Sequence, residues 1–268
     1  MYLKKYLKII IIMTDSDRIV EIKTVQSNAI RILFEALKDI LTDVNLQISS
    51  EGLKIISMDG SKQAVVNLKL EANKFEKFYC INVMHAGLNM TSLYKIIKSV
   101  KNSDIITFYI LADSSTKLHI EIENKEKKTN ILTVLKLLDI DEDILDIPNI
   151  EFDTVKTMPS NDFQSYIREL SIITNKITLQ SKNNTFSLIG EGDFAKTTIN
   201  VGDSNTINMG TEHNAIGMFY IKYLLLFTKS TNLCTTIEIY LKNKFPLILV
   251  YNVANLGKLQ YCLAPLIE

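Results

Sequence analysis

Residues 28–49, NAIRILFEALKDILTDVNLQIS, share one pattern with residues 161–182, NDFQSYIRELSIITNKITLQSK. Each stretch opens with apolar residues at helical spacing and then alternates between apolar and polar residues, which predicts a helix followed by a strand. Asn28 in the first copy and Ser160 or Asn161 in the second are candidate N-caps. The chain is therefore predicted to contain an internal duplication, in which one constant offset aligns Ile30 with Phe163, Leu33 with Tyr166, Leu37 with Leu170 and Ile40 with Ile173.

A second helix-then-strand pair follows in each half, at TSLYKIIKSVKNSDIITFYI from Thr91 and at FYIKYLLLFTKSTNLCTTIEIYL from Phe219. Short alternating segments, separated by Asp-Gly, Gly-Lys and Asn-Asn, lie between the helices, and this pattern is typical of antiparallel hairpins. The predicted fold class is α+β, with two similar halves that each lay two helices on antiparallel sheet.

Composition restricts the function classes. The 268 residues are 47% hydrophobic and 22% charged, as in ordinary globular proteins. Lys and Arg together number 30, as do Asp and Glu, so net charge indicates no partner and a basic nucleic-acid surface must be a local patch. The three cysteines form no CxxC pair, which argues against a disulfide framework or a zinc site. The opening MYLKKYLKIIIIM is shorter than a membrane span and lacks a cleavage site, so residues 1–17 are interpreted as an extension, with Met13 as an alternative start.

Two motifs suggest chemistry that their surroundings do not support. GEGDFA, residues 190–195, fits the dinucleotide fingerprint, but a β-branched strand pattern follows where a helix should begin, so a hairpin turn is expected. LLDIDEDILDIP, residues 137–148, places carboxylates at calcium-loop positions, but Ile144 and Ile150 stand where that loop needs Gly and Glu. The three histidines belong to no catalytic or metal-binding motif, and His119 is interpreted as an ordinary residue of a strand. The sequence predicts no enzyme, no metal site and no cofactor.

Basic residues recur on the polar faces of all four predicted helices. On the first helix, Ile30, Leu33, Phe34, Leu37 and Leu41 form the apolar face and leave Arg31 and Lys38 on the other. The other helices carry Lys95, Lys98, Arg168, Lys222 and Lys229 in similar places, and we expect no acidic residues clustered on the same faces. For a single helix, a solvated surface is the commoner explanation. Four helices with one pattern favour a basic surface that contacts phosphates and does not read bases.

Several long segments, in order, carry a resemblance to a known family: FEALKDI (34–40), SMDGSKQAVVNLKL (57–70), NMTSLYKIIK (89–98), SDIITF (103–108), LLDIDEDILDIP (137–148), MPSNDF and IREL (158–170), KYLLLFTKST (222–231) and PLILVYNVANLGKLQYCLAPLIE (246–268). Over nearly all of residues 18–268 the sequence resembles the proliferating cell nuclear antigen family of DNA sliding clamps. The resemblance implies a DNA-clamp fold and a non-catalytic homotrimeric ring, with sheet outside and helices lining a hole for duplex DNA. The ring would act as a DNA polymerase processivity factor and recruit replication and repair partners, including the polymerase and the clamp loader.

The resemblance also implies roles for particular residues. DNA contacts would come from Arg31, Lys38, Lys95, Lys98, Arg168, Lys222 and Lys229. A partner-peptide groove would be lined by Met58, Val65, Leu145, Ile147, Pro246, Ala264, Pro265 and Ile267. Subunit contacts would join strand 129–136, through Thr129, Ile131, Thr133 and Leu135, to strand 194–201 of the next chain, through Lys196, Thr197 and Ile199. The predicted domains are an N-terminal extension (1–17), an N-terminal clamp domain (18–136), an interdomain connector (137–150) and a C-terminal clamp domain (151–268).

The sequence also departs from the family pattern in the predicted groove. Lys62 and Gln63 replace a basic-or-His and apolar pair, Cys262 stands where the family has an aromatic, and Lys182 is the counterpart of a modified lysine. The alternatives are a checkpoint-type clamp subunit, a processivity factor that closes no ring, or an enzyme that uses GEGDFA and the central carboxylates. The expected location is the nucleus, or a cytoplasmic replication factory if the chain is viral.

Overall fold

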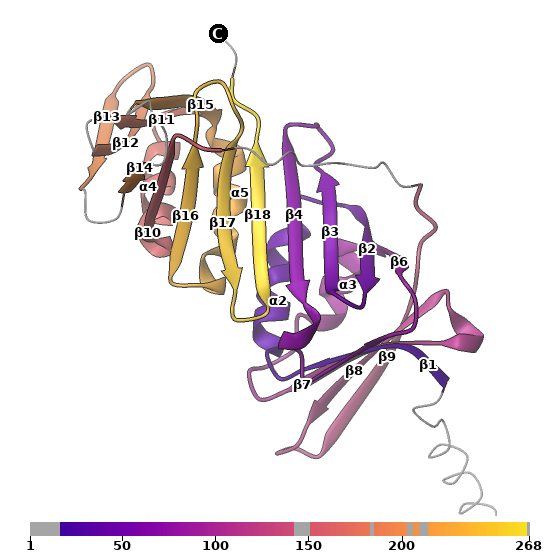
Figure 1. Ribbon diagram of the computed structural model, residues 1–268. Helices are drawn as coiled ribbons and strands as arrows, with labels where there is room; N and C mark the ends of the chain where they lie inside the picture. The colour runs from indigo at the N-terminus through magenta and orange to yellow at the C-terminus, as the bar shows by residue number, and fades with distance from the viewer. Residues whose placement is uncertain (1–16, 142–150, 183–184, 203–205, 209–213, 267–268) are drawn as a thin grey trace, which may run out of the picture.

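A computed structural model describes residues 17–141, 151–182, 185–202, 206–208 and 214–266, and Figure 1 shows its two halves side by side. The elements of the first half are β1 (Arg18–Thr24), α2 (Ser27–Leu37), β2 (Asp43–Ser49), β3 (Gly52–Met58), β4 (Ala64–Glu71), η2 (Ala72–Lys74), β5 (Lys77–Cys80), β6 (Met84–Asn89), α3 (Met90–Ile97), β7 (Ile105–Leu111), η3 (Ala112–Ser114), β8 (Lys117–Asn124) and β9 (Thr129–Lys136). Those of the second are β10 (Thr154–Pro159), α4 (Ser160–Ser171), β11 (Lys176–Lys182), β12 (Thr185–Glu191), β13 (Lys196–Val201), β14 (Thr206–Asn208), β15 (Ala215–Tyr220), α5 (Ile221–Phe227), η4 (Thr228–Leu233), β16 (Thr236–Leu241), β17 (Leu247–Val253) and β18 (Gly257–Leu263).

The predicted duplication is confirmed by the order of the strands and α-helices, which is the same in both halves. It extends to single hydrogen bonds. The buried hydroxyl of Ser27, at the start of α2, donates to the carbonyl of Lys101, and that of Ser160, at the start of α4, donates to the carbonyl of Cys234. Each bond ties the first helix of a half to the segment after its second helix. The N-cap predictions were wrong, because α2 begins at Ser27 and α4 at Ser160, without a side-chain cap at Gln26 or Pro159.

The strands form three sheets, and every pairing between them is antiparallel, as predicted. Their orders are β5-β1-β7-β8-β9, β14-β10-β16-β17-β18-β4-β3-β2-β6 and β13-β12-β11-β15. The nine-stranded sheet runs through both halves, because β4 of the first half pairs with β18 of the second along their whole length. Strands β9 and β13 are left as free edges of the two outer sheets.

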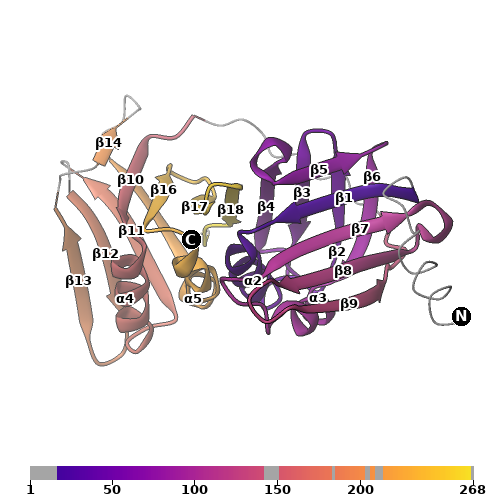
Figure 2. The ribbon, with the colours of Figure 1, turned by 90° about the horizontal axis from the view of Figure 1, so that it is seen from below.

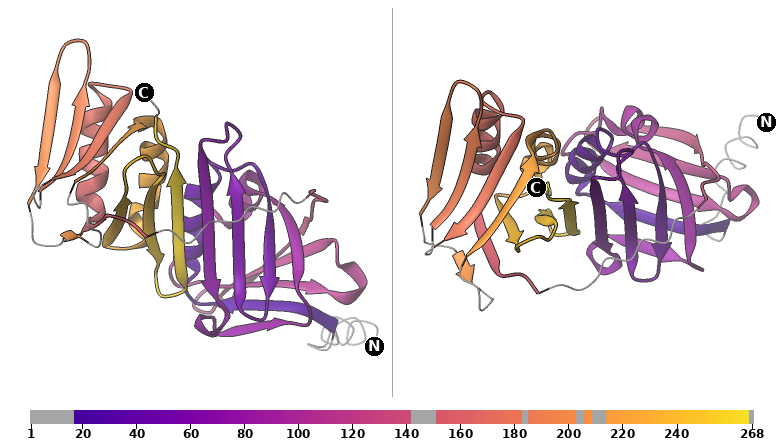
Figure 3. Two further views of the ribbon diagram at one scale, coloured as in Figure 1. Left: turned by 45° about the horizontal axis from the view of Figure 1, so that its top comes forward. Right: turned by 90° about the horizontal axis from the view of Figure 1, so that it is seen from above.

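The helices cover one side of the central sheet with their apolar faces. In α2 the predicted residues Ile30, Leu33, Phe34 and Leu37 are buried, as is Leu41 just beyond the helix. Helix α4 buries Phe163, Ile167 and Leu170, whereas Tyr166 is only partly buried. Figure 2 shows α4, α5, α2 and α3 in one row, and the views in Figure 3 place that row on one side of the central sheet. Polar faces of four helices therefore point to the same side of the molecule.

The segments that follow the last strand of each half also correspond. The amide of Leu138 donates to the carbonyl of Gly87 at 2.8 Å, and the amide of Leu266 donates to the carbonyl of Met218 at 2.8 Å. Gly87 is required at its position, since a Cβ there would lie 2.2 Å from the carbonyl oxygen of Leu138. The described start of the predicted connector thus lies across β6, and Asn45 on β2 donates to the carbonyl of Ile140. Residues 142–150 lie outside the described residues.

Candidate DNA-facing surface, subunit edges and partner groove

The seven basic residues predicted to contact DNA lie on the row of helices or at its ends. Lys95 is on α3, Arg168 on α4, Lys222 on α5 and Lys229 on η4. These four and Lys98, the C-cap of α3, are exposed, whereas Arg31 on α2 and Lys38 at its C-cap are half-buried. Contacts between α2 and η4, which belong to different halves, bring the two sets of basic residues together. Basic side chains on neighbouring helical segments could contact the phosphates of a polyanion that lies across them.

Acidic residues do lie on the same face, so the expectation that they would be absent was wrong. Arg31 Nη1 lies 3.0 Å from Glu35 Oε2, one helical turn away. Asp39 holds Lys38 at 2.6 Å through Oδ1 and Lys229 at 2.7 Å through Oδ2. Burial opposes the charge of Asp39, but hydrogen bonds from the two lysines outweigh it and lower the pKa of the carboxyl. These acids were visible in the sequence as an i,i+4 pair and an adjacent Lys-Asp pair.

Two lysines of the basic surface lie over tyrosine rings. The Lys222 ammonium lies 4.9 Å from the ring centroid of Tyr223 and 5.7 Å from that of Tyr220. Lys38 lies 5.2 Å from the centroid of Tyr94. Partial burial and a hydrogen bond to Glu35 raise the pKa of Tyr94. A ring face attracts a cation without offering it a counter-charge, so these contacts orient Lys222 and Lys38 but do not replace an anionic ligand.

The strands predicted to join subunits, β9 and β13, are each an edge strand of an outer sheet, whose opposite edges are β5 and β15. On β9, Ile131 is paired with the buried Ile122 of β8 and therefore sits on the helix-side face of its sheet, yet it is 54% exposed. On β13, Ile199 lies opposite the buried Leu188 and also points to the helix side. Of the remaining predicted contact residues, Thr129 and Lys196 are exposed and Thr133, Leu135 and Thr197 are partly buried. Both edges thus offer unpaired backbone groups beside half-covered apolar residues.

The predicted groove residues lie on neighbouring strands. The register aligns Met58 of β3 with Val65 of β4, Val65 with Cys262 of β18, and Cys262 with Ile248 of β17. Burial raises the pKa of Cys262 to about 11, so the thiol is neutral and behaves as an apolar side chain. Ile248 was missed, because its place in the row follows from the register and not from any sequence motif. The other described groove residues, Pro246, Ala264 and Pro265, are partly buried, whereas Leu145, Ile147 and Ile267 lie outside the described residues.

Asp59 organises the turn between β3 and β4 at the rim of this groove. Its carboxylate accepts hydrogen bonds from the amides of Gln63 at 2.8 Å and Ala64 at 2.7 Å and from Ser61. Burial works against the charge, but these bonds lower the pKa of Asp59. Tyr223 of α5 also contacts Asp59 and Ser61, so the turn is fixed to the second half. The carbonyl of Gln63 in turn accepts from the amide of Ala264 at 2.9 Å.

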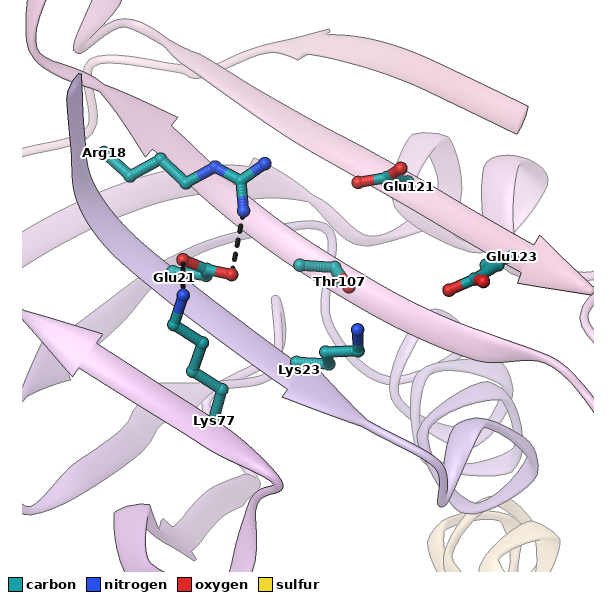
Figure 4. Close-up of a pocket in the computed structure, with 7 residues that line it drawn as sticks. All are labelled: Arg18, Glu21, Lys23, Lys77, Thr107, Glu121 and Glu123. Atoms are coloured by element: carbon teal, nitrogen blue, oxygen red, sulfur yellow. Dashed lines mark ion pairs between the residues drawn. The ribbon is translucent and has the colours of Figure 1, made fainter. Parts of the chain in front are cut away.

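A charged cavity of about 310 Å³ lies on the outer face of the first sheet (Figure 4). Glu21 is 5% exposed there and pairs with Arg18 at 2.8 Å and with Lys77 at 2.7 Å. Lys23, Thr107, Glu121 and Glu123 complete the lining, so the charges of both signs are balanced within it. No residue of the three candidate sites lines this cavity. Among the described residues, no three His, Cys, Asp or Glu side chains form a metal-binding group, and no described helix could cross a membrane.

Comparisons with known proteins agree with this geometry over both halves. Residues 19–144 match the family model of the proliferating cell nuclear antigen N-terminal domain, and residues 146–266 match that of the C-terminal domain. A "Probable DNA polymerase sliding clamp 1" from Paramecium bursaria Chlorella virus 1 is 34% identical over 264 residues, covering 96% of this chain and 100% of that relative. The chain belongs to the proliferating cell nuclear antigen family and has its two-domain clamp fold.

Proposed function

We propose that three copies of this chain form a closed ring around duplex DNA, with the helices inside and the sheets outside, and that the ring is a DNA polymerase sliding clamp. The observation that supports this most strongly is the row of four helices with basic residues on one face, bounded by the free edges β9 and β13. An edge strand at each end of one chain lets copies join head to tail. Such an assembly becomes a ring when the rotations between successive copies add up to a full turn. A viral relative named as a sliding clamp supports the same function.

In this ring the basic residues contact phosphates without reading bases. Long, mobile lysines hold charge near the duplex and exchange phosphates readily, so the ring stays on DNA and still slides. The ring carries out no chemistry. It keeps a bound polymerase at high effective concentration near the primer end, which turns rebinding into an intramolecular step. We place this work in the nucleus, or in a cytoplasmic factory if the chain is viral.

The polymerase and other partners would bind through short peptides in the groove of Met58, Val65, Cys262 and Ile248. An apolar groove of this kind takes aromatic or aliphatic anchors from a partner. Leu145 and Ile147 of the predicted connector would form its second wall. The double substitution Leu145→Ser with Ile147→Ser should abolish binding of a polymerase-derived peptide while the molar mass of the ring stays unchanged. Peptide binding at the original affinity would exclude the groove as the docking site.

Charge reversal tests the DNA-facing surface. Lys95→Glu, Lys98→Glu and Lys222→Glu replace three exposed cations, which lie on α3, at its C-cap and on α5. The triple variant should fold normally and should reduce clamp-dependent processive synthesis. Normal processivity in a correctly folded variant would remove the argument from the basic surface.

A further inference from the structure

The basic surface contains one site where an acid holds two of the DNA-facing lysines at once. Asp39 follows the C-cap of α2 by one residue and joins Lys38 to Lys229. Each carboxylate oxygen accepts from one ammonium, at 2.6 Å and 2.7 Å. The other candidate lysines differ, because no described carboxylate forms an ion pair with Lys95, Lys98 or Lys222. Asp39 therefore pairs with only two of the candidate DNA-facing lysines, Lys38 and Lys229.

Helix stability does not explain an acid at this place. A negative charge at the C-terminal end of a helix is disfavoured by the helix dipole. The pair with Lys229 is substantially exposed, with side chains 47% and 28% accessible, and such pairs add little to stability. What Asp39 does achieve is to place a carboxylate where two ammonium groups converge from both halves of the chain. A DNA phosphate would seek that same position, since it also presents anionic oxygens to two neighbouring lysines.

We propose that Asp39 is an internal competitor for DNA phosphates, which keeps Lys38 and Lys229 partly neutralised so that the ring holds the duplex weakly enough to slide. The inference rests on the proposed function. A phosphate that approaches this point must displace the carboxylate or share the lysines with it. In a ring of three copies the competitor appears three times, so its effect is repeated around the hole.

Asp39→Asn tests the proposal, since it removes the charge and keeps the shape of the side chain. Binding of a short labelled duplex to the full-length protein is measured by fluorescence anisotropy over a salt series. Each lysine that gains a phosphate contact should steepen the slope of log K against log salt by about 0.9, which at about 0.15 M salt is roughly fivefold tighter binding. Diffusion of the clamp along DNA, followed one molecule at a time, should slow.

Two matched variants separate charge from structure. Asp113→Asn makes the same change at an exposed residue of η3. This residue lies near the start of β1, whereas α2 follows the other end of that strand, so the variant should leave the slope unchanged. Asp39→Glu keeps the competitor and should retain the slope of the original protein. The melting temperature of each variant shows whether Asp39 stabilises the contact between the two halves.

Unchanged or weaker DNA binding by Asp39→Asn would overturn the proposal, and a lower melting temperature with an unchanged slope would leave Asp39 as a structural tie only. A separate arm with Lys95→Glu and Lys98→Glu tests the DNA surface itself. If that variant binds DNA as well as the original protein, the proposed function fails. If it binds less well and Asp39→Asn is neutral, only the inference about Asp39 fails.

Discussion

Ile131→Asp is the substitution that should most selectively open the proposed ring. Ile131 sits on the free edge β9, on the helix-side face of its sheet, and is 54% exposed in the single chain. In the proposed ring it would pack near Ile199 on the β13 edge of the next chain, which points to the same side. Because the side chain is already half exposed, an aspartate there should leave the fold of the single chain intact.

The expected effect on the interface is large. Complete burial of an isoleucine is worth about 1.5–3 kcal/mol, so the half that the interface would cover contributes about 1 kcal/mol. The aspartate must also be taken out of water without a partner, which costs several kcal/mol more. Each interface should thus weaken by at least about 3 kcal/mol. Removal of one chain from a closed ring breaks two interfaces, so dissociation should be favoured by roughly 10⁴-fold.

The assay is molar mass by light scattering at micromolar concentration, with circular dichroism to confirm folding. Ile131→Asp should elute near the chain mass of 30.5 kDa, whereas the original protein should show about three times that value. Ile81→Asp is the matched control, since Ile81 is also 54% exposed and follows β5, which lies at the opposite edge of the same sheet from β9. A stable trimer of Ile131→Asp would refute the assignment of β9 as a subunit edge.

Three further predictions concern the turn, the duplication and the groove. Because the pKa of Asp59 is lowered on folding, its stabilising effect is complete above the unfolded value of 3.8 and is lost as pH falls through the folded pKa. Asp59→Asn should therefore cost about 1–2 kcal/mol of unfolding free energy at pH 7. In denaturant titrations the unfolding free energy of this variant should depend less on acid pH than that of the original protein. An equal loss at pH 7 and below pH 3 would contradict this. Ser160→Ala should cost about 1–2 kcal/mol, because the partly buried carbonyl of Cys234 loses its donor, whereas the exposed Ser165→Ala should stay within about 0.5 kcal/mol. Equal unfolding midpoints for the two variants would disprove the structural role of Ser160. Met58→Glu places a charge in the apolar groove and should weaken a glutamine- and aromatic-containing clamp-binding peptide at least about tenfold by calorimetry, and unchanged affinity would count against the groove.

The fold could be predicted from the sequence where local patterns decide it. The helix periodicity of residues 28–41 and the matching pattern after Asn161 identified two equivalent helix-then-strand units, and the structure confirms both. The turn at GEGDFA was recognised because the next residues alternate, and Gly192 indeed donates to Ala195 across that turn. Such features depend on neighbours in the chain, which a sequence displays directly.

Features that depend on contacts between distant segments were not predictable in the same way. The helix starts were misplaced, because Ser27 and Ser160 are held by carbonyls of a later segment and not by local capping. The continuous central sheet depends on the pairing of β4 with β18, nearly two hundred residues apart, as its register from Ala64–Leu263 to Leu70–Gly257 shows. The link from Asp39 to Lys229 likewise crosses from one half to the other. The assignments of DNA, groove and subunit residues and the domain boundaries stay predictions.

A topological-linkage assay shows whether the protein encircles DNA. The protein is allowed to thread onto a linear duplex, both ends are then closed with bulky protein blocks, and retention after a high-salt wash is compared with that on the same duplex with open ends. A closed ring should remain on the blocked DNA and be lost from the open DNA, because salt removes the phosphate contacts but not the linkage. Equal loss from both substrates would show that the protein binds DNA without encircling it, and the account of a sliding ring would be wrong.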